Sequence, residues 1–239
     1  MKIRDYFDRV YVINLPHRTD RRRGITRELA ACGLGLEQGK VEIFPGVLPA
    51  EAAGFPSIAV RGCLLSHFEI LKLACSQGLR NVLIIEDDLG ISPQLRREED
   101  GIVEQLRATD WGIVYLGHFE KVEPAVPARL IPYPTDKHII TTHFYGVSGL
   151  VAERLVRFLE ALQQRPAGHP LGGPMYPDGA ISTFRQQNPD VVTLVACPSL
   201  GWQRSSPSDL HPAWFDRLPG VRALVQLGRA GRNWLRRCR

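Results

Sequence analysis

Cysteines are few in this sequence, and their spacing excludes two classes of protein. The five cysteines stand at positions 32, 63, 75, 197 and 238, and no two of them form a Cys-x-x-Cys pair. Neither a cysteine-rich zinc cage nor a disulfide framework fits an odd number at such spacings. Free thiols are typical of a reducing compartment, so we expect a cytoplasmic protein.

Long apolar runs are missing as well. No stretch approaches the roughly 20 apolar residues that a membrane-crossing helix needs. The first residues carry charges, including Lys2, Arg4 and Asp5, where a signal peptide would have its apolar segment. We therefore expect neither a membrane span nor export.

Excess charge is confined to the tail, residues 212–239. The net charge is +5, but the tail alone has seven arginines against Asp216, so the rest is nearly neutral. A neutral body argues against nucleic acid as a partner. Apolar residues such as Trp234 alternate with the arginines of the tail, which suits either an anionic membrane surface or a helix packed on the body. Membrane contact would place the protein peripherally on the inner face of the cytoplasmic membrane.

Apolar runs alternate with amphipathic segments along the chain, which predicts an α/β fold with a mostly parallel sheet and helices on both faces. One domain is expected over residues 1–211, followed by the tail. Irregular loops are expected where proline and glycine are frequent, at 45–60, 120–137 and 165–179. The expected strands are 10–15, 41–44, 81–85, 111–117, 139–147 and 191–196, and the expected helices are 19–32, 63–77, one starting at 93, 152–164 and 179–187.

Three consecutive acids, Glu86, Asp87 and Asp88, follow the apolar strand 81–85. Open α/β sheets bind ligands beyond the carboxyl ends of their strands. Alternation along an extended chain would point Glu86 and Asp88 to one side and Asp87 to the other. A hard cation such as Mg²⁺ or Mn²⁺ would relieve the repulsion between the carboxylates. The alternative is a solvated strand end.

Four arginines, at positions 18, 21, 22 and 23, crowd the start of the first long helix. Cations there oppose the helix dipole, whereas a bound anion would reverse the sign of the interaction. Free backbone N–H groups and guanidinium groups together form a phosphate site. The alternative is a solvated basic face, and Thr19 or Asp20 could cap the same helix.

Several segments stand in a recognisable order: residues 12–22 (VINLPHRTDRR), 62–67 (GCLLSH), 83–88 (LIIEDD), 111–117 (WGIVYLG), 145–148 (YGVS), 177–178 (PD), and Gln203 with 208–210 (SDL). Taken together, these segments resemble the family 25 glycosyltransferases of the lipopolysaccharide-biosynthesis type. The resemblance spans about residues 10–210, in the order that the family shows.

The resemblance implies a GT-A-like fold and an inverting transfer that depends on Mn²⁺ or Mg²⁺. It implies a nucleotide-sugar donor, often UDP-galactose, and a saccharide or glycolipid acceptor. Glu86 and Asp88 would correspond to the motif that holds the metal and the nucleotide. Residues expected at the donor are Asn14, Leu15, Arg18, Arg21, Ser66, His67, Asp87, His143 and Gln203, although a histidine beside an apolar helix face, such as His67, is often a plain core residue.

An inverting transfer needs a base that takes the proton of the acceptor hydroxyl. Asp178 is the first candidate, and its alternative role is to cap the helix 179–187. Asp209 is the second candidate. Two other functions stay open: a metal-dependent phosphotransferase or nuclease, disfavoured because Asn14 stands where a further acid is expected, and a non-catalytic carbohydrate-binding relative.

Overall fold

The apolar runs of the sequence form the strands of one central sheet in a computed structural model that describes residues 1–123 and 125–204. The strand order across this seven-stranded sheet is β2-β1-β3-β7-β5-β8-β6. In chain order the elements are α1 (Ile3–Tyr6), β1 (Arg9–Asn14), α2 (Thr19–Ala31), β2 (Val41–Pro45), α3 (Ile58–Ser76), β3 (Asn81–Glu86), β4 (Leu89–Ile91), α4 (Pro93–Ala108), β5 (Ile113–Gly117), β6 (Arg129–Pro132), β7 (Phe144–Ser148), α5 (Gly149–Gln164), α6 (Pro177–Gln187), β8 (Thr193–Cys197) and β9 (Gly201–Gln203).

Five strands of the sheet run in one direction. β1 pairs in parallel with β2 and β3, and β5 pairs in parallel with β8. β7 lies antiparallel between β3 and β5, and β6 is antiparallel to β8 at the edge. Since β7 separates β3 from β5, the ends of β1 and β3 form one group, and the acids that follow β3 lie beside the end of β1.

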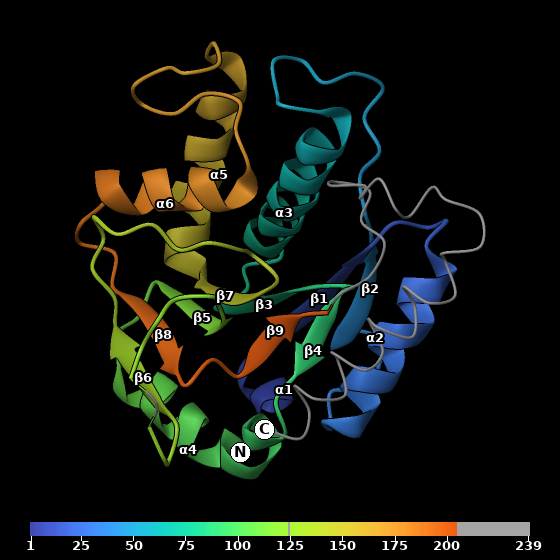
Figure 1. Cartoon of the computed structure of the whole chain (residues 1–239), viewed down its shortest axis with the longest axis vertical. Coiled ribbons are helices and arrows are strands. Elements are labelled where there is room, and N and C mark those ends of the chain that lie inside the picture. The colour runs from blue at the N-terminus through green and yellow to red at the C-terminus, as the bar shows by residue number, and fades with distance from the viewer. Residues whose placement is uncertain (124, 205–239) are drawn as a thin grey trace.

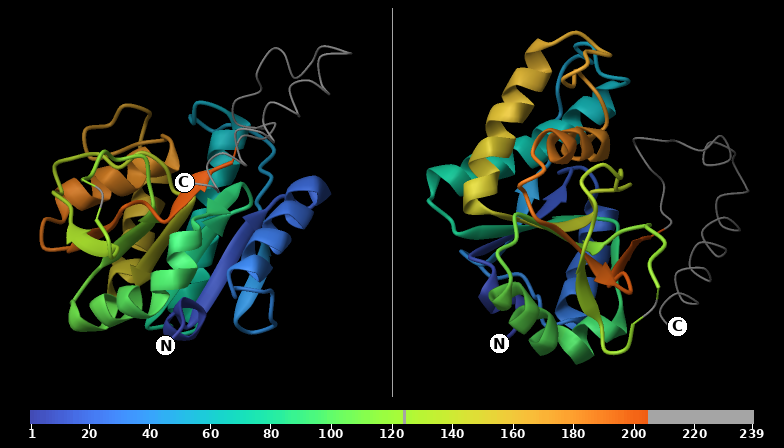
Figure 2. Two further views of the ribbon diagram at one scale, coloured as in Figure 1. Left: turned by 60° about the horizontal axis from the view of Figure 1, so that its bottom comes forward. Right: turned by 90° about the vertical axis from the view of Figure 1, so that its left-hand side faces the viewer.

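Side chains alternate along the buried strands between two separate cores. Val82 and Ile84 of β3 belong to the core under α3, α5 and α6, whereas Leu83 and Ile85 belong to the core under α1, α2 and α4. In Figure 1, α3, α5 and α6 lie above the sheet and α1 and α4 lie below it, and the views of Figure 2 show the sheet between the two groups. The predicted α/β class, with a mostly parallel sheet and helices on both faces, is confirmed.

Some elements differ from those expected. α3 begins at Ile58 rather than near residue 63, because the Ser57 side chain accepts a hydrogen bond from the Val60 N–H and caps the helix. β6 lies within the expected loop 120–137, with Pro132 at an edge position where no ladder N–H is needed. β4 pairs with β9 in a small second sheet that the sequence did not indicate.

No helix in the described part of the chain is both long enough and apolar enough to cross a membrane. The tail, residues 212–239, lies outside the described residues, so its expected membrane contact and the expected domain boundary at 211 stay predictions.

Candidate functional site

Glu86 lies at the carboxyl end of β3, on the face of the sheet that α3 covers. Its Oε1 accepts a hydrogen bond from the Thr142 hydroxyl at 2.7 Å, and Nε2 of His67 on α3 lies 3.5 Å from the same oxygen. Burial acts to raise the pKa of Glu86, but His67 and Thr142 outweigh it, and the pKa lies below its ordinary value. The first acid of the cluster is therefore held ionised by neighbours from two other segments.

Asp87 is turned to the other face, toward α2 and the end of β1. Arg21 donates to its Oδ1 at 2.8 Å, and the Asn14 side chain donates to its Oδ2 at 2.7 Å. Burial nevertheless raises its pKa, against the opposing effect of Arg21. Glu86 and Asp87 thus diverge, as strand alternation predicts.

Asp88 lies beside Asp87 at the same arginine rather than opposite to it, because β3 ends at Glu86, and Asp87 and Asp88 form a turn before β4. Glu86 and Asp88 nevertheless line the same cavity. The Asp88 Oδ2 lies 3.4 Å from the same Arg21 nitrogen that binds Asp87, and it accepts a hydrogen bond from Gln203 at 3.1 Å.

The other oxygen of Asp88, Oδ1, is buried and has no hydrogen-bond partner among the described residues. The side chain of Asp88 is only 7% exposed. Burial, followed by the repulsion of Glu86, raises its pKa to about 7. A buried carboxylate oxygen without a partner costs roughly 1–3 kcal/mol or more. A cation at this oxygen would remove the cost, so the donor set fits a hard divalent ion.

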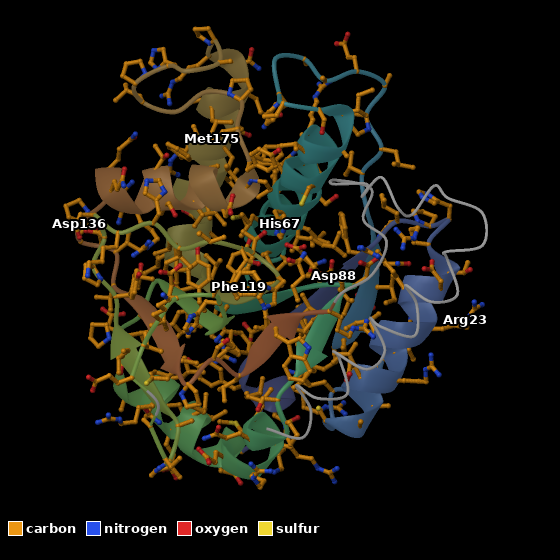
Figure 3. The ribbon with its side chains drawn as sticks, in the orientation of Figure 1. Arg23, His67, Asp88, Phe119, Asp136 and Met175 are labelled. Carbon is orange, nitrogen blue, oxygen red and sulfur yellow. The ribbon has the colours of Figure 1, made fainter. Side chains whose placement is uncertain are left out.

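A cavity of about 280 Å³ opens in front of the three acids. Arg18 and Arg21 supply its basic side, and Gln203 closes it beside Asp88. In Figure 3, Asp88 and His67 lie near the middle of the molecule, whereas Arg23 lies at its outer edge. The remaining lining is largely apolar and consists of Ile13, Leu15, His17, Val47, Leu48, Pro49, Ile58, Ala59, Gly62, Cys63 and Ser66.

The arginines of α2 divide into two pairs. Arg18 and Arg21 line the cavity, while Arg22 and Arg23 are exposed and form a solvated basic face. Arg18 is the N-cap residue, so Thr19 and Asp20 lie inside the first turn and the expectation that one of them caps the helix is wrong. Asp20 instead accepts two hydrogen bonds from Arg18 at 3.1 Å, which holds the guanidinium at the cavity.

The segment 62–67 attaches α3 to the loop that carries Val47. The Ser66 hydroxyl accepts from the Val47 N–H at 2.9 Å and donates to the Gly62 carbonyl at 2.7 Å. A Cβ on Gly62 would lie 2.6 Å from the Val47 carbonyl oxygen, so only glycine permits this approach. Ser66 thus lines the cavity and also fixes one of its walls.

Two expected residues, His143 and Asp178, are not among the residues that line the cavity. His143 precedes β7 and is fully buried, and burial lowers its pKa to about 4. Asp178 is in the first turn of α6, where Tyr176 is the N-cap, so Asp178 does not cap the helix. Its Oδ2 accepts from the Thr141 N–H at 3.2 Å, next to Thr142, which binds Glu86. Asp209 lies outside the described residues.

Three residues that the fold brings to the site were not predicted from the sequence. Thr142 donates to Glu86, and Cys63 lines the cavity beside the acids. Arg204 donates from its side chain to the Asp87 carbonyl at 2.8 Å and from its backbone to the Asp88 carbonyl. Only Cys63 left a signal, because its spacing of four from His67 puts both side chains on one face of a helix.

Comparison with known proteins identifies relatives among the family 25 glycosyltransferases. Procollagen galactosyltransferase 1 of Danio rerio is 30% identical over 173 residues, which are 63% of this chain and 28% of the relative. A glycosyltransferase 25 family member of Drosophila melanogaster is 29% identical over 138 residues, 51% and 22% of the two chains. The inactive glycosyltransferase 25 family member 3 of Homo sapiens is 29% identical over 136 residues, 49% and 23% of the two chains. The resemblance to family 25 is thereby confirmed.

The chain spans less than a third of the length of these curated relatives. No family model matches it. One solved structure, of a glycosyltransferase involved in glycosylation of the major capsid of PBCV-1, aligns with 78% of this chain and 91% of its own at 12% identity, with a TM-score of 0.39. That likeness is too weak to carry an argument, so the fold assignment rests on the strand order described above.

Proposed function

We propose that this chain is an inverting glycosyltransferase that moves a sugar, galactose in the first instance, from a UDP-sugar to a hydroxyl group of a saccharide. The curated relatives named galactosyltransferases support the choice of sugar. The acceptor class that follows from the sequence resemblance is lipopolysaccharide or another cell-surface glycan.

The observation that carries the proposal is the buried Asp88 Oδ1, which lacks a hydrogen-bond partner in the described part of the chain and belongs to a residue that lines the cavity. Glu86 and Asp88 are the residues that would hold Mn²⁺ or Mg²⁺. When bound, such an ion would neutralise negative charge on the departing nucleoside diphosphate. Asp87 stays engaged by Arg21 and Asn14 and keeps that arginine in place.

The cavity has the two kinds of surface that a nucleotide sugar needs. Arg18 and Arg21 offer guanidinium groups, which bind phosphate through paired N–H donors. Leu15, Leu48 and Pro49 line the cavity and offer an apolar wall to the base and the sugar ring. Removal of the charges of Arg18 and Arg21 should weaken donor binding more than it destabilises the fold.

Asp178 remains the first candidate for the base that accepts the proton of the acceptor hydroxyl. Backbone N–H groups of Thr141 and Gly179 donate to its two oxygens, at 3.2 and 2.8 Å, and hold the carboxylate in one orientation. Because Thr142 bridges this segment to Glu86, Asp178 is joined to the acid cluster from the side opposite α2. Asp209 remains the second candidate.

A cytoplasmic location, at the inner face of the membrane through the tail, stays part of the proposal. Deletion of residues 212–239 should reduce binding to vesicles that contain anionic lipid, because each basic residue near such a surface contributes about 1 kcal/mol. Equal binding with and without the tail would refute this part alone.

The test combines donor binding with turnover. Wild-type protein should be stabilised by UDP-galactose in the presence of Mn²⁺ and should release UDP, since a ligand of the native state raises its stability. Asp88→Asn should weaken Mn²⁺-dependent donor binding more than about tenfold, by analogy with losses at metal sites. Asp178→Asn should retain donor binding and lose turnover. Asp110→Asn, at an exposed position, is the matched control.

Each alternative function predicts a different result. Donor binding without turnover by the wild type would point to a non-catalytic relative. One human relative in the family is named as inactive. Hydrolysis of nucleic acid or transfer of phosphate, with no stabilisation by any UDP-sugar, would point to a nuclease or phosphotransferase. Full activity of Asp88→Asn would contradict the assignment of the site.

A further inference from the structure

Cys63, His67 and Glu86 bring three different ligand atoms together at the floor of the cavity. Cys63 and His67 are one turn apart on α3, so their side chains share a face, and that face meets the end of β3. The Cys63 Sγ, a ring nitrogen of His67 and a carboxylate oxygen of Glu86 all lie within 4.8 Å of one another. Two of the three, Cys63 and Glu86, line the cavity.

The burial and orientation of the His67 ring are a second observation that points to a bound ligand. The residue is 2% exposed, and apart from the Glu86 oxygen 3.5 Å away, its Nε2 has no hydrogen-bond partner within residues 1–123 and 125–204. The other nitrogen, Nδ1, lies 3.1 Å from the Tyr145 hydroxyl, which fixes the ring and aims Nε2 at Glu86. Metal-binding histidines are typically held in this way, with the second nitrogen hydrogen-bonded.

The spacing of these atoms suits one tetrahedral ion. Nitrogen and oxygen ligands that lie about 2.1 Å from zinc at a tetrahedral angle are separated by about 3.4 Å. The distance between the His67 Nε2 and the Glu86 Oε1 is 3.5 Å. Three protein ligands leave a fourth position for water or a small ligand, as in zinc sites that are open to a cavity.

Local charge also favours a cation at this point. The carboxylates of Glu86, Asp88, Asp178 and Asp87 create a negative potential at Cys63. The same negative potential attracts a cation, and a coordinated thiol loses its proton outright. Sulfur and imidazole ligands select zinc-like ions over Mn²⁺ and Mg²⁺.

We propose that Cys63, His67 and Glu86 form a binding site for a thiophilic divalent cation of the zinc class, which has Glu86 in common with the hard-cation pair Glu86 and Asp88. The site needs neither a nucleotide sugar nor Mn²⁺, so it does not depend on the proposed function. Because the two sites share Glu86, a zinc-class ion bound here withdraws a ligand from the hard-cation site.

The test uses Co²⁺ as a spectroscopic substitute for zinc, added to the full chain without nucleotide or Mn²⁺. Coordination by a thiolate gives an intense sulfur-to-cobalt absorption band, which Zn²⁺ in excess should abolish. Cys63→Ser should lose the band, and His67→Gln should weaken Co²⁺ binding at least tenfold. Cys75→Ser is the matched control, because Cys75 is another half-buried cysteine on α3 that is not part of the group, and it should keep the band.

Far-ultraviolet circular dichroism identifies any variant that has lost its fold. Whether a thiophilic cation binds at all is decided by the wild-type spectrum alone. Absence of a zinc-displaceable thiolate band in the wild type would overturn the proposal, as would retention of the band in folded Cys63→Ser. Sugar transfer is not measured in this experiment. A protein that transfers galactose but shows no band would therefore refute this site and leave the proposed function intact.

Discussion

Replacing Asp88 with asparagine should stabilise the metal-free protein at alkaline pH while it removes donor binding. The pKa of Asp88 is raised from 3.8 to about 7 by burial and by its acidic neighbours. Holding this carboxylate ionised in the native state therefore costs roughly 4 kcal/mol at about pH 8, at about 1.4 kcal/mol per pKa unit. Asparagine has the same shape and no charge, and its amide oxygen can still accept from Gln203.

The direction of the pH dependence follows from proton binding. Between 3.8 and about 7 the native state binds the Asp88 proton and the unfolded state has lost it, so stability falls as pH rises through this window. Asp88→Asn does not lose stability in this way. Its free energy of unfolding should exceed that of the wild type by roughly 4 kcal/mol near pH 8 and by less than about 2 kcal/mol near pH 5.

Urea unfolding in the presence of a chelator measures both values, since a bound cation would offset the cost in the wild type. Asp110→Asn, the exposed control, should change the free energy of unfolding by less than about 0.5 kcal/mol at either pH. Added Mn²⁺ should stabilise the wild type and leave Asp88→Asn unchanged. The reasoning fails if Asp88→Asn is no more stable than the wild type at pH 8, or if its advantage does not shrink toward pH 5.

Two further variants probe the surroundings of the site. Gly62→Ala should lower the free energy of unfolding by about 1–3 kcal/mol and weaken donor binding, because its Cβ would meet the Val47 carbonyl at 2.6 Å on the cavity wall. Gly101→Ala is the control on α4, where the added Cβ meets no atom within 4 Å, and an equal loss there would contradict the steric argument. His143→Gln should reduce the amount of stability that the protein loses as the pH falls. The pKa of His143 is lowered from 6.5 to about 4, so the wild type loses up to roughly 3 kcal/mol as pH falls through that window, and equal slopes for both proteins in urea unfolding would refute this.

Local sequence signals predicted most of the helices and strands. Ser92 followed by Pro93 marked the start of α4, and the Ser92 side chain does accept from the Gln94 N–H. The apolar run before Glu86 identified β3 as a strand buried on both faces. These signals are short-range, because a cap or an alternation pattern needs only neighbours within a few residues. The strand β6 and the β4–β9 pair form through partners distant in the chain, so local patterns did not predict them.

The candidate site divides in the same way between sequence and fold. The sequence by itself placed Glu86, Asp87 and Asp88 after a buried strand and arginines at the start of a helix. Tertiary structure alone decided that Arg21 reaches across 66 residues to Asp87, and that Asp88 lies at the same arginine. It also brought the His67 Nε2 to within 3.5 Å of the Glu86 Oε1. Periodicity describes which face a side chain takes, but the partner across that face, and so the charge it feels, is set by contacts between segments far apart in the chain.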